Sequence, residues 1–126
     1  MARILIVDDE VDLCEEFSKL LSEDRHEVDI AENGMIALAK LEHRDYDLVF
    51  LDVLMPKMEG REVLESIRKK SQIPVAIISA YLSPDKEKEA HKLGAVACFR
   101  KPFDLKVIRK LIDKIEKENT SNRKVD

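Results

Sequence analysis

The sequence predicts an α/β fold in which five parallel strands form one doubly wound sheet with five helices. Short, dense apolar runs alternate along the chain with longer segments whose apolar residues recur every three or four positions. Dense apolar runs are typical of parallel strands, which are buried on both faces, and the longer spacing is typical of amphipathic helices. Polar residues directly follow several of the runs. Strands that alternate with helices imply a parallel sheet with helices on both faces.

The first two predicted strands are each followed by a helix. The strands are expected at residues 4–7 and 28–31, and Asn33-Gly34 is a turn signal after the second strand. The two helices present apolar stripes that would cover the sheet. These stripes consist of Leu13, Cys14, Phe17, Leu20 and Leu21 in one helix, and of Ile36, Ala37, Leu38 and Leu41 in the other.

The third strand is expected at residues 48–51, directly before Asp52. Residues 55–60 contain a proline and a glycine and are expected to form a loop. A third helix follows, with an apolar stripe that consists of Val63, Leu64 and Ile67. The fourth strand is expected at residues 75–79.

The remaining elements have clear boundary signals. Ser83 is a candidate N-cap, followed by a helix to about residue 93, and Gly94 is a candidate C-cap. A brief fifth strand is expected at residues 97–100, and Asp104 can cap the last helix. From Glu118 on, no apolar periodicity remains. We therefore expect one domain over residues 1–117 and a polar tail or linker stub over residues 118–126.

Composition and charge favour a single globular domain. The chain has 126 residues, 44% of them hydrophobic and 38% charged, with a formal net charge of -4. Basic residues are scattered, which argues against a nucleic-acid surface, and no apolar stretch approaches the roughly twenty residues of a membrane span. Cys14 and Cys98 lack CxxC spacing and are expected to be reduced thiols. The predicted location is cytoplasmic.

Five polar side chains are predicted at the carboxyl edge of the sheet. Asp8 and Asp9 follow the first strand, Asp52 follows the third, Ser79 ends the fourth and Lys101 follows the fifth. Open α/β sheets bind their ligands at this edge. Taken singly, an aspartate here is a helix cap, the serine a turn hydroxyl and the lysine a solvated charge. Their joint occurrence favours a functional site.

The charges of this set predict a metal ion and a nucleophile. Three neighbouring carboxylates repel one another, and a divalent cation together with the Lys101 ammonium would bring the total charge near zero. Oxygen ligands suit a hard cation, and Mg²⁺ also binds phosphate oxygens. A carboxylate such as Asp52 that attacks phosphorus forms an acyl phosphate. Mg²⁺, Ser79 and Lys101 could then contact the phosphoryl oxygens.

Four short motifs lie at the ends of the predicted strands. They are Ile-Leu-Ile-Val-Asp-Asp-Glu at residues 4–10, Leu-Asp-Val-Leu-Met-Pro-Lys-Met-Glu-Gly at 51–60, Ile-Ser-Ala at 78–80 and Lys-Pro-Phe at 101–103. Together they resemble the receiver domains of two-component response regulators, over about residues 2–115. The resemblance implies a flavodoxin-like sheet with strand order 2-1-3-4-5.

The resemblance also implies a role for each residue of the predicted site. Asp52 would be the phosphoacceptor. Asp9, Asp52 and the backbone carbonyl of Leu54 would bind Mg²⁺ directly, and Asp8 would act through water. Ser79 and Lys101 would contact a phosphoryl group received from a sensor histidine kinase or a phosphotransfer protein. The chain would be a regulator, not an enzyme, that promotes its own phosphoryl transfer and slow dephosphorylation and changes its partner-binding surface.

One position departs from the family, and one alternative function stays open. Cys98, three positions before Lys101, occupies a place where these domains usually have an aromatic residue that turns inward on activation. The alternative function is an unphosphorylated scaffold with the same fold, which would be expected to lose some of the five site residues. A nucleotide or phosphoester enzyme lacks support, because the chain has no GxxxxGK or GxGxxG motif. The target protein or output domain is not specified.

Overall fold

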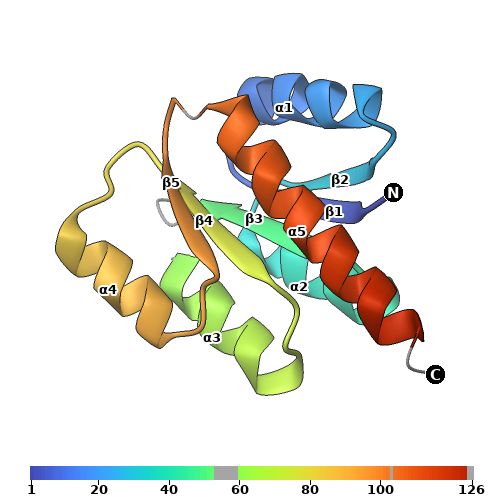
Figure 1. Ribbon diagram of the computed structural model, residues 1–126. Coiled ribbons are helices and arrows are strands. Elements are labelled where there is room, and N and C mark those ends of the chain that lie inside the picture. The colour runs from blue at the N-terminus through green and yellow to red at the C-terminus, as the bar shows by residue number, and fades with distance from the viewer. Residues whose placement is uncertain (53–59, 103, 125–126) are drawn as a thin grey trace.

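The computed structural model describes residues 1–52, 60–102 and 104–124. Within these ranges five strands alternate with five helices (Figure 1). They are β1 (Arg3–Val7), α1 (Val11–Glu23), β2 (Glu27–Ala31), α2 (Gly34–His43), β3 (Leu48–Asp52), α3 (Gly60–Lys70), β4 (Val75–Ser79), α4 (Pro84–Lys92), β5 (Ala97–Arg100) and α5 (Leu105–Lys124).

The strands form one parallel sheet in the order β2-β1-β3-β4-β5, which confirms the predicted fold class and strand order. Each strand begins and ends within one residue of its expected position. The central strands β1, β3 and β4 are buried almost throughout, as their dense apolar runs predict. All five strands therefore end at one common edge, called here the carboxyl edge.

Successive strand residues point to opposite faces of the sheet and supply two separate cores. Ile6 and Phe50 belong to the core that α1 and α5 cover, whereas Val7 and Leu51 belong to the core that α2, α3 and α4 cover. Figure 1 shows α1 and α5 lying together, apart from α3 and α4. Full burial of a side chain such as Phe50 contributes about 1.5–3 kcal/mol, so these two cores fix the positions of the strand ends.

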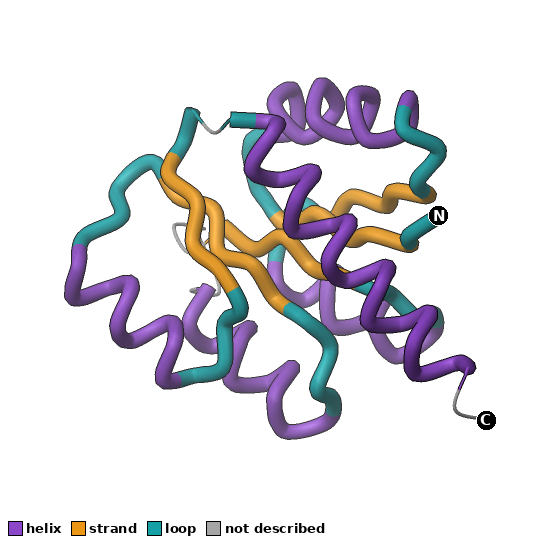
Figure 2. Tube along the Cα trace, viewed as in Figure 1, coloured by secondary structure: helices purple, strands orange, loops and turns teal. Residues whose placement is uncertain are grey.

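Local signals set several helix ends. Ser83 and Asp104 each accept a hydrogen bond from a backbone N–H in the first turn of the following helix, as predicted, and Asn33 does the same for α2. Gly94 follows α4 with a φ of +97°, and a Cβ atom there would lie 2.6 Å from Nε of Arg68. Glycine is therefore required at this turn. Figure 2 shows the loops that join the helices and strands.

Two boundaries differ from the sequence prediction. Gly60 is the first residue of α3 and not part of a loop, and the rest of the expected loop, residues 55–59, lies outside the described ranges. Helix α5 continues beyond residue 117 to Lys124, and the side chain of Asn119 donates a hydrogen bond to Asp47 at 2.9 Å. A domain boundary at residue 117 stays a prediction. In the described part of the chain, no helix is both long and apolar enough to span a bilayer.

Candidate functional site

All five predicted site residues lie at the carboxyl edge, where the sequence places them, and Asp9 is the one of the five that is exposed. Asp8 directly follows β1, Asp52 and Ser79 are the last residues of β3 and β4, and Lys101 directly follows β5. Asp8, Asp52 and Ser79 are 2%, 4% and 0% exposed, respectively. Three polar side chains at this depth must be paired with one another or with neighbouring polar groups.

The Lys101 ammonium provides that pairing for the carboxylates. Its Nζ lies 2.5 Å from Oδ2 of Asp8 and 3.2 Å from Oδ2 of Asp52, and 3.4 Å from Oε1 of Glu10. Burial by itself lowers the pKa of Lys101. The hydrogen bond to Asp8 and the charges of Asp52 and Asp8 outweigh burial, so the pKa of Lys101 is raised above its usual value. The lysine is therefore a permanent cation of this edge.

The carboxylates of this edge fit a divalent cation. Asp8, Glu10 and Asp52 each offer an oxygen, and these oxygens lie within 4.8 Å of one another. Three carboxylates and the one ammonium of Lys101 give a formal charge of -2. Only oxygen atoms are offered, which suits a hard ion such as Mg²⁺. A divalent ion would balance the excess charge.

The structure gives Glu10 a place that the sequence analysis did not assign to it. The backbone N–H of Glu10 donates to Oδ1 of Asp8 at 3.0 Å, and its carboxylate joins the acidic group. Asp9, the predicted direct ligand, is exposed and is not part of that group. The backbone carbonyl of Leu54 lies outside the described residues. The ligand roles of Asp9 and Leu54 stay predictions. Glu10 stands in the same motif as Asp8, which is the signal that could have identified it.

Ser79 is fixed by backbone contacts on both sides. Its carbonyl accepts the N–H of Lys101 at 2.8 Å, and its Oγ accepts the N–H of Tyr81 at 3.1 Å. Within the described ranges, no fully buried side-chain nitrogen or oxygen lacks a hydrogen-bond partner. Ser79 therefore links the end of β5 to the segment that leads from β4 into α4.

Cys14 lies beneath the acidic edge as a protonated thiol. Its Sγ donates to the carbonyl of Asp8 at 3.6 Å, and its side chain is only 2% exposed. Burial first, and then the charge of Asp8, raises the pKa of Cys14 to about 12. The group is therefore neither a nucleophile nor a thiolate metal ligand at neutral pH. Cys14 and Cys98 are both free thiols.

Cys98 lies on β5 and faces α4. Together with Pro84, Glu87, Lys88, His91, Lys92 and Ala97, it lines a groove of about 670 Å³ between the two elements. Burial first, and then the charge of Glu87, raises the pKa of its thiol. Tyr81, the nearest aromatic residue in the segment after Ser79, is 72% exposed. Tyr81 is therefore turned outward, and Cys98 contributes a small thiol to the groove beside α4.

The fold and the edge together define a flavodoxin-like α/β protein with a lysine-bridged pair of buried aspartates. The family model of the response regulator receiver domain matches residues 4–113. The chain belongs to the response regulator receiver domain family. It is accordingly a phosphoryl-accepting switch of two-component signalling.

Curated relatives with similar sequences are longer than this chain. The transcriptional regulatory protein CpxR homolog of Haemophilus influenzae is 42% identical over 104 residues, which are 82% of this chain and 45% of that protein. The transcriptional regulatory protein ZraR of Klebsiella oxytoca is 40% identical over 102 residues, 80% of this chain and 23% of that protein. The chain thus spans less than half the length of either relative.

Solved structures agree with this fold over nearly their whole length. The response regulator protein TrrA from Thermotoga maritima, in complex with Mg(2+)-BeF, matches with a TM-score of 0.81 and 35% identity, over 91% of this chain and 99% of that one. The chemotaxis protein CheY4 of Vibrio cholerae matches with a TM-score of 0.84 and 32% identity, over 91% of this chain and 98% of that one.

Proposed function

We propose that Asp52 is the residue that carries the phosphoryl group of this switch. The observation that carries the proposal is the Lys101 ammonium, which bridges Asp8 and Asp52 at 2.5 and 3.2 Å while only 12% of the lysine side chain is exposed. A cation at this position stabilises negative charge on Asp52 and on any anionic group attached to it. Asp52 also ends the central strand β3, at the edge where open α/β sheets bind ligands.

The reaction that this geometry supports is a phosphoryl transfer from histidine to aspartate. A carboxylate oxygen of Asp52 forms a bond to phosphorus, and the bond from phosphorus to a histidine nitrogen of the donor breaks. The nitrogen keeps the bonding electron pair, and an acyl phosphate remains on Asp52. Lys101 then donates to one phosphoryl oxygen and the Ser79 hydroxyl to another, because charge is spread over these oxygens during transfer.

Mg²⁺ is part of the proposal. Asp8, Asp9 and Asp52 would hold it with the carbonyl of Leu54, and Glu10 is an additional carboxylate of the same edge. When bound, Mg²⁺ neutralises charge on the carboxylates and on the phosphoryl oxygens. The support is the all-oxygen donor set and the excess negative charge of the edge.

The partners of the proposed switch follow from its chemistry. The phosphoryl donor is a sensor histidine kinase or a phosphotransfer protein, and the phosphorylated domain presents an altered surface to a target protein or an output domain. The longer relatives named as transcriptional regulatory proteins support an output domain in the whole protein. Under this proposal the domain is a regulator that promotes its own phosphorylation, not an enzyme with a separate substrate. A cytoplasmic location stays a prediction.

Acetyl phosphate, a small phosphoryl donor, tests the assignment directly. With Mg²⁺ present, intact-mass measurement should show one phosphoryl addition on the parent that is stable in acid and lost in base. The addition should be absent from Asp52→Asn and retained by Asp12→Asn, a matched control because Asp12 is an exposed acid in the first turn of α1. Equal labelling of Asp52→Asn would refute the assignment, and an unlabelled parent would favour the scaffold alternative.

A further inference from the structure

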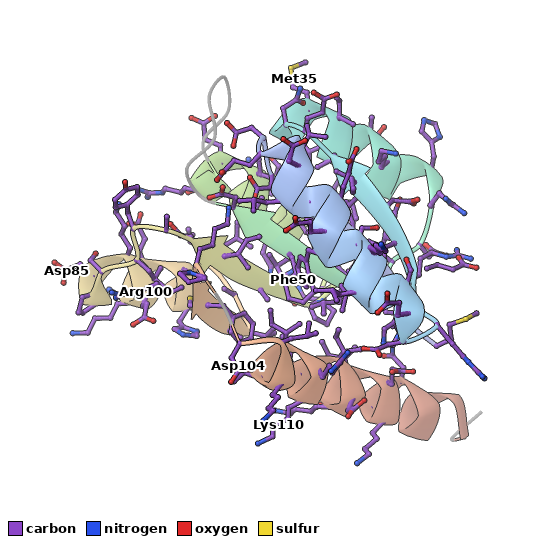
Figure 3. The ribbon with its side chains drawn as sticks, turned by 90° about the horizontal axis from the view of Figure 1, so that it is seen from above. Met35, Phe50, Asp85, Arg100, Asp104 and Lys110 are labelled. Carbon is purple, nitrogen blue, oxygen red and sulfur yellow. The ribbon has the colours of Figure 1, made fainter. Side chains whose placement is uncertain are left out.

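The segment between β4 and α4, called here the β4–α4 loop (residues 80–83), is tied to β5 by the side chain of Arg100. Arg100 pairs with Ser79 in the register of the two strands. Its Nη2 reaches past this pair and donates to the carbonyl of Leu82 at 2.6 Å. Figure 2 shows this loop leaving the sheet beside the carboxyl end of β5, and Figure 3 shows Arg100 on the side of the molecule that carries Asp85, at the start of α4.

Apart from the bond to Arg100, the hydrogen bonds described for the β4–α4 loop are local. The N–H of Tyr81 donates to Oγ of Ser79 at 3.1 Å, and Nζ of Lys86 donates to the carbonyl of Tyr81 at 3.4 Å. Tyr81 is 72% exposed, whereas Leu82 is 6% exposed and belongs to the core on the α4 side of the sheet. Leu82 is therefore the anchor of the loop, and Arg100 holds the backbone of that anchor.

Movement of Ser79 toward a phosphoryl group would strain the hydrogen bond between Arg100 and the Leu82 carbonyl. The Ser79 hydroxyl that accepts the N–H of Tyr81 is the group expected to donate to the phosphoryl oxygen. A shift of Ser79 toward Asp52 therefore breaks or drags its contact with Tyr81, and Leu82 follows next along the chain. A hydrogen bond with an ionised donor, such as Arg100 to Leu82, is stronger than one between neutral groups and opposes that shift.

We propose that Arg100 is a positioning residue of the switch, whose guanidinium holds the Leu82 carbonyl and so stabilises the unphosphorylated position of the β4–α4 loop. The inference rests on the proposed phosphorylation of Asp52. Arg100 and Cys98 lie two residues apart on β5 and hence on the same face of the strand. On this face of β5, Arg100 is the residue that donates a hydrogen bond to the backbone of the β4–α4 loop.

The hydrogen bond to the Leu82 carbonyl is the main contact of the Arg100 guanidinium. Among residues 1–52, 60–102 and 104–124, no carboxylate lies within ion-pair distance of its guanidinium. The side chain is exposed, so water competes for its remaining N–H groups. Its loss should therefore shift the balance between the two loop positions without unfolding the domain.

The test compares Arg100→Met with the parent by amide chemical shifts and by beryllium fluoride binding in the presence of Mg²⁺. Without beryllium fluoride, the amide chemical shifts of Tyr81 and Leu82 in Arg100→Met should lie between two values of the parent protein. These are the shifts of the free parent and those of the parent saturated with beryllium fluoride. Its affinity for beryllium fluoride should rise about fivefold, the factor equal to a loss of about 1 kcal/mol, one net hydrogen bond. The beryllium fluoride affinity of Arg100→Lys, which keeps a charged donor, should lie between those of the parent and Arg100→Met.

Arg109→Met is the matched control, because it removes the same side chain from the other face of the sheet, where Nε of Arg109 pairs with Asp24 at 2.7 Å. It should behave like the parent. Unchanged or weaker affinity of Arg100→Met, with amide shifts outside the range between the two parent values, would overturn the inference. If Arg100→Met fails to fold, Arg100→Gln is judged by the same criteria. A parent that does not bind beryllium fluoride, or binds it as well as Asp52→Asn does, would overturn the proposed function itself.

Discussion

The strands begin at one edge of the sheet, called here the amino edge, and end at the carboxyl edge. Both edges carry acidic and basic side chains, but these charges are paired differently. At the amino edge, Asp47 accepts the backbone N–H of Arg3 at 2.9 Å and the side-chain amide of Asn119 at 2.9 Å, and the Arg3 guanidinium pairs with Glu27 at 3.0 Å. At the carboxyl edge, Asp8 and Asp52 share the ammonium of Lys101.

This difference separates a structural edge from a functional one. At the amino edge, the carboxylate of Asp47 accepts hydrogen bonds from neutral donors, which add no charge. Arg3 forms a separate ion pair with Glu27. At the carboxyl edge, one cation faces three acids, so negative charge remains that a metal ion can balance. In this domain the buried aspartates that share one cation lie at the candidate ligand site, whereas the half-buried Asp47, which has two hydrogen-bond donors, has a structural role.

The largest effect is expected from breaking the shared cation. Lys101→Met would leave Asp8 and Asp52 as uncompensated buried charges, so the free energy of unfolding should fall by about 3 kcal/mol in the absence of Mg²⁺. Lys70→Met removes a lysine from an exposed pair with Glu42 and should cost less than about 1 kcal/mol. Urea unfolding measures both. Equal losses in the two variants would mean that the carboxyl edge is no more charge-dependent than the surface.

The pH dependence of stability at Tyr46 tests whether the region beside the amino edge is unaffected by Mg²⁺ at the carboxyl edge. The phenol of Tyr46 donates to Oδ2 of Asp29 at 2.5 Å. Burial first, and then this hydrogen bond, raises the pKa of Tyr46 from 10.0 to about 12. The unfolded chain then loses this proton at a lower pH than the folded domain does. The stabilisation is therefore complete below about pH 10 and is lost as the pH rises toward about 12.

Between those pH values the parent should lose about 2 kcal/mol more than Tyr46→Phe, which lacks the titrating group. Urea unfolding at several alkaline pH values measures the difference between the two proteins. The difference should be the same with and without Mg²⁺, because Tyr46 lies away from the carboxyl edge. Parallel pH curves for the two proteins would contradict the burial and hydrogen bonding of this phenol.

A smaller effect tests the excess charge of the carboxyl edge. Mg²⁺ at ten times its dissociation constant should stabilise the parent by about 1.4 kcal/mol, through mass action on the folded state. Asp9→Ala should lose this response, and Asp47→Asn, at the amino edge, should keep it. Glu10→Gln shows whether Glu10 contributes to binding. Thermal melts measure each response, and a shift in Asp9→Ala as large as in the parent would place the ion elsewhere.

Most residues of the carboxyl edge could be predicted from the sequence, because apolar runs reveal where the strands end. The apolar runs before Asp8 and Asp52 mark parallel strands, and the carboxyl ends of all parallel strands share one edge. Ser79 and Lys101 follow from the same rule applied to β4 and β5. The strand order came from the family resemblance, since an apolar run does not identify its neighbour in the sheet.

Other features depend on geometry that the residue pattern does not contain. Whether Asp9 or Glu10 faces the site depends on the backbone angles of the turn after β1. The contact of Arg100 with Leu82 depends on a side chain reaching across two elements. Helix α5 continues beyond its apolar stripe to Lys124, and in this extension Asn119 donates a hydrogen bond to Asp47, a contact that apolar periodicity does not reveal.

The most direct test of the central claim locates the phosphoryl group at a single residue. After treatment with acetyl phosphate and Mg²⁺, borohydride reduction converts a phosphorylated aspartate into homoserine, and peptide mass spectrometry finds its position. Homoserine is expected at residue 52, with Asp8, Asp9 and Asp12 unchanged. Homoserine at Asp8 or Asp9, with Asp52 intact, would contradict it.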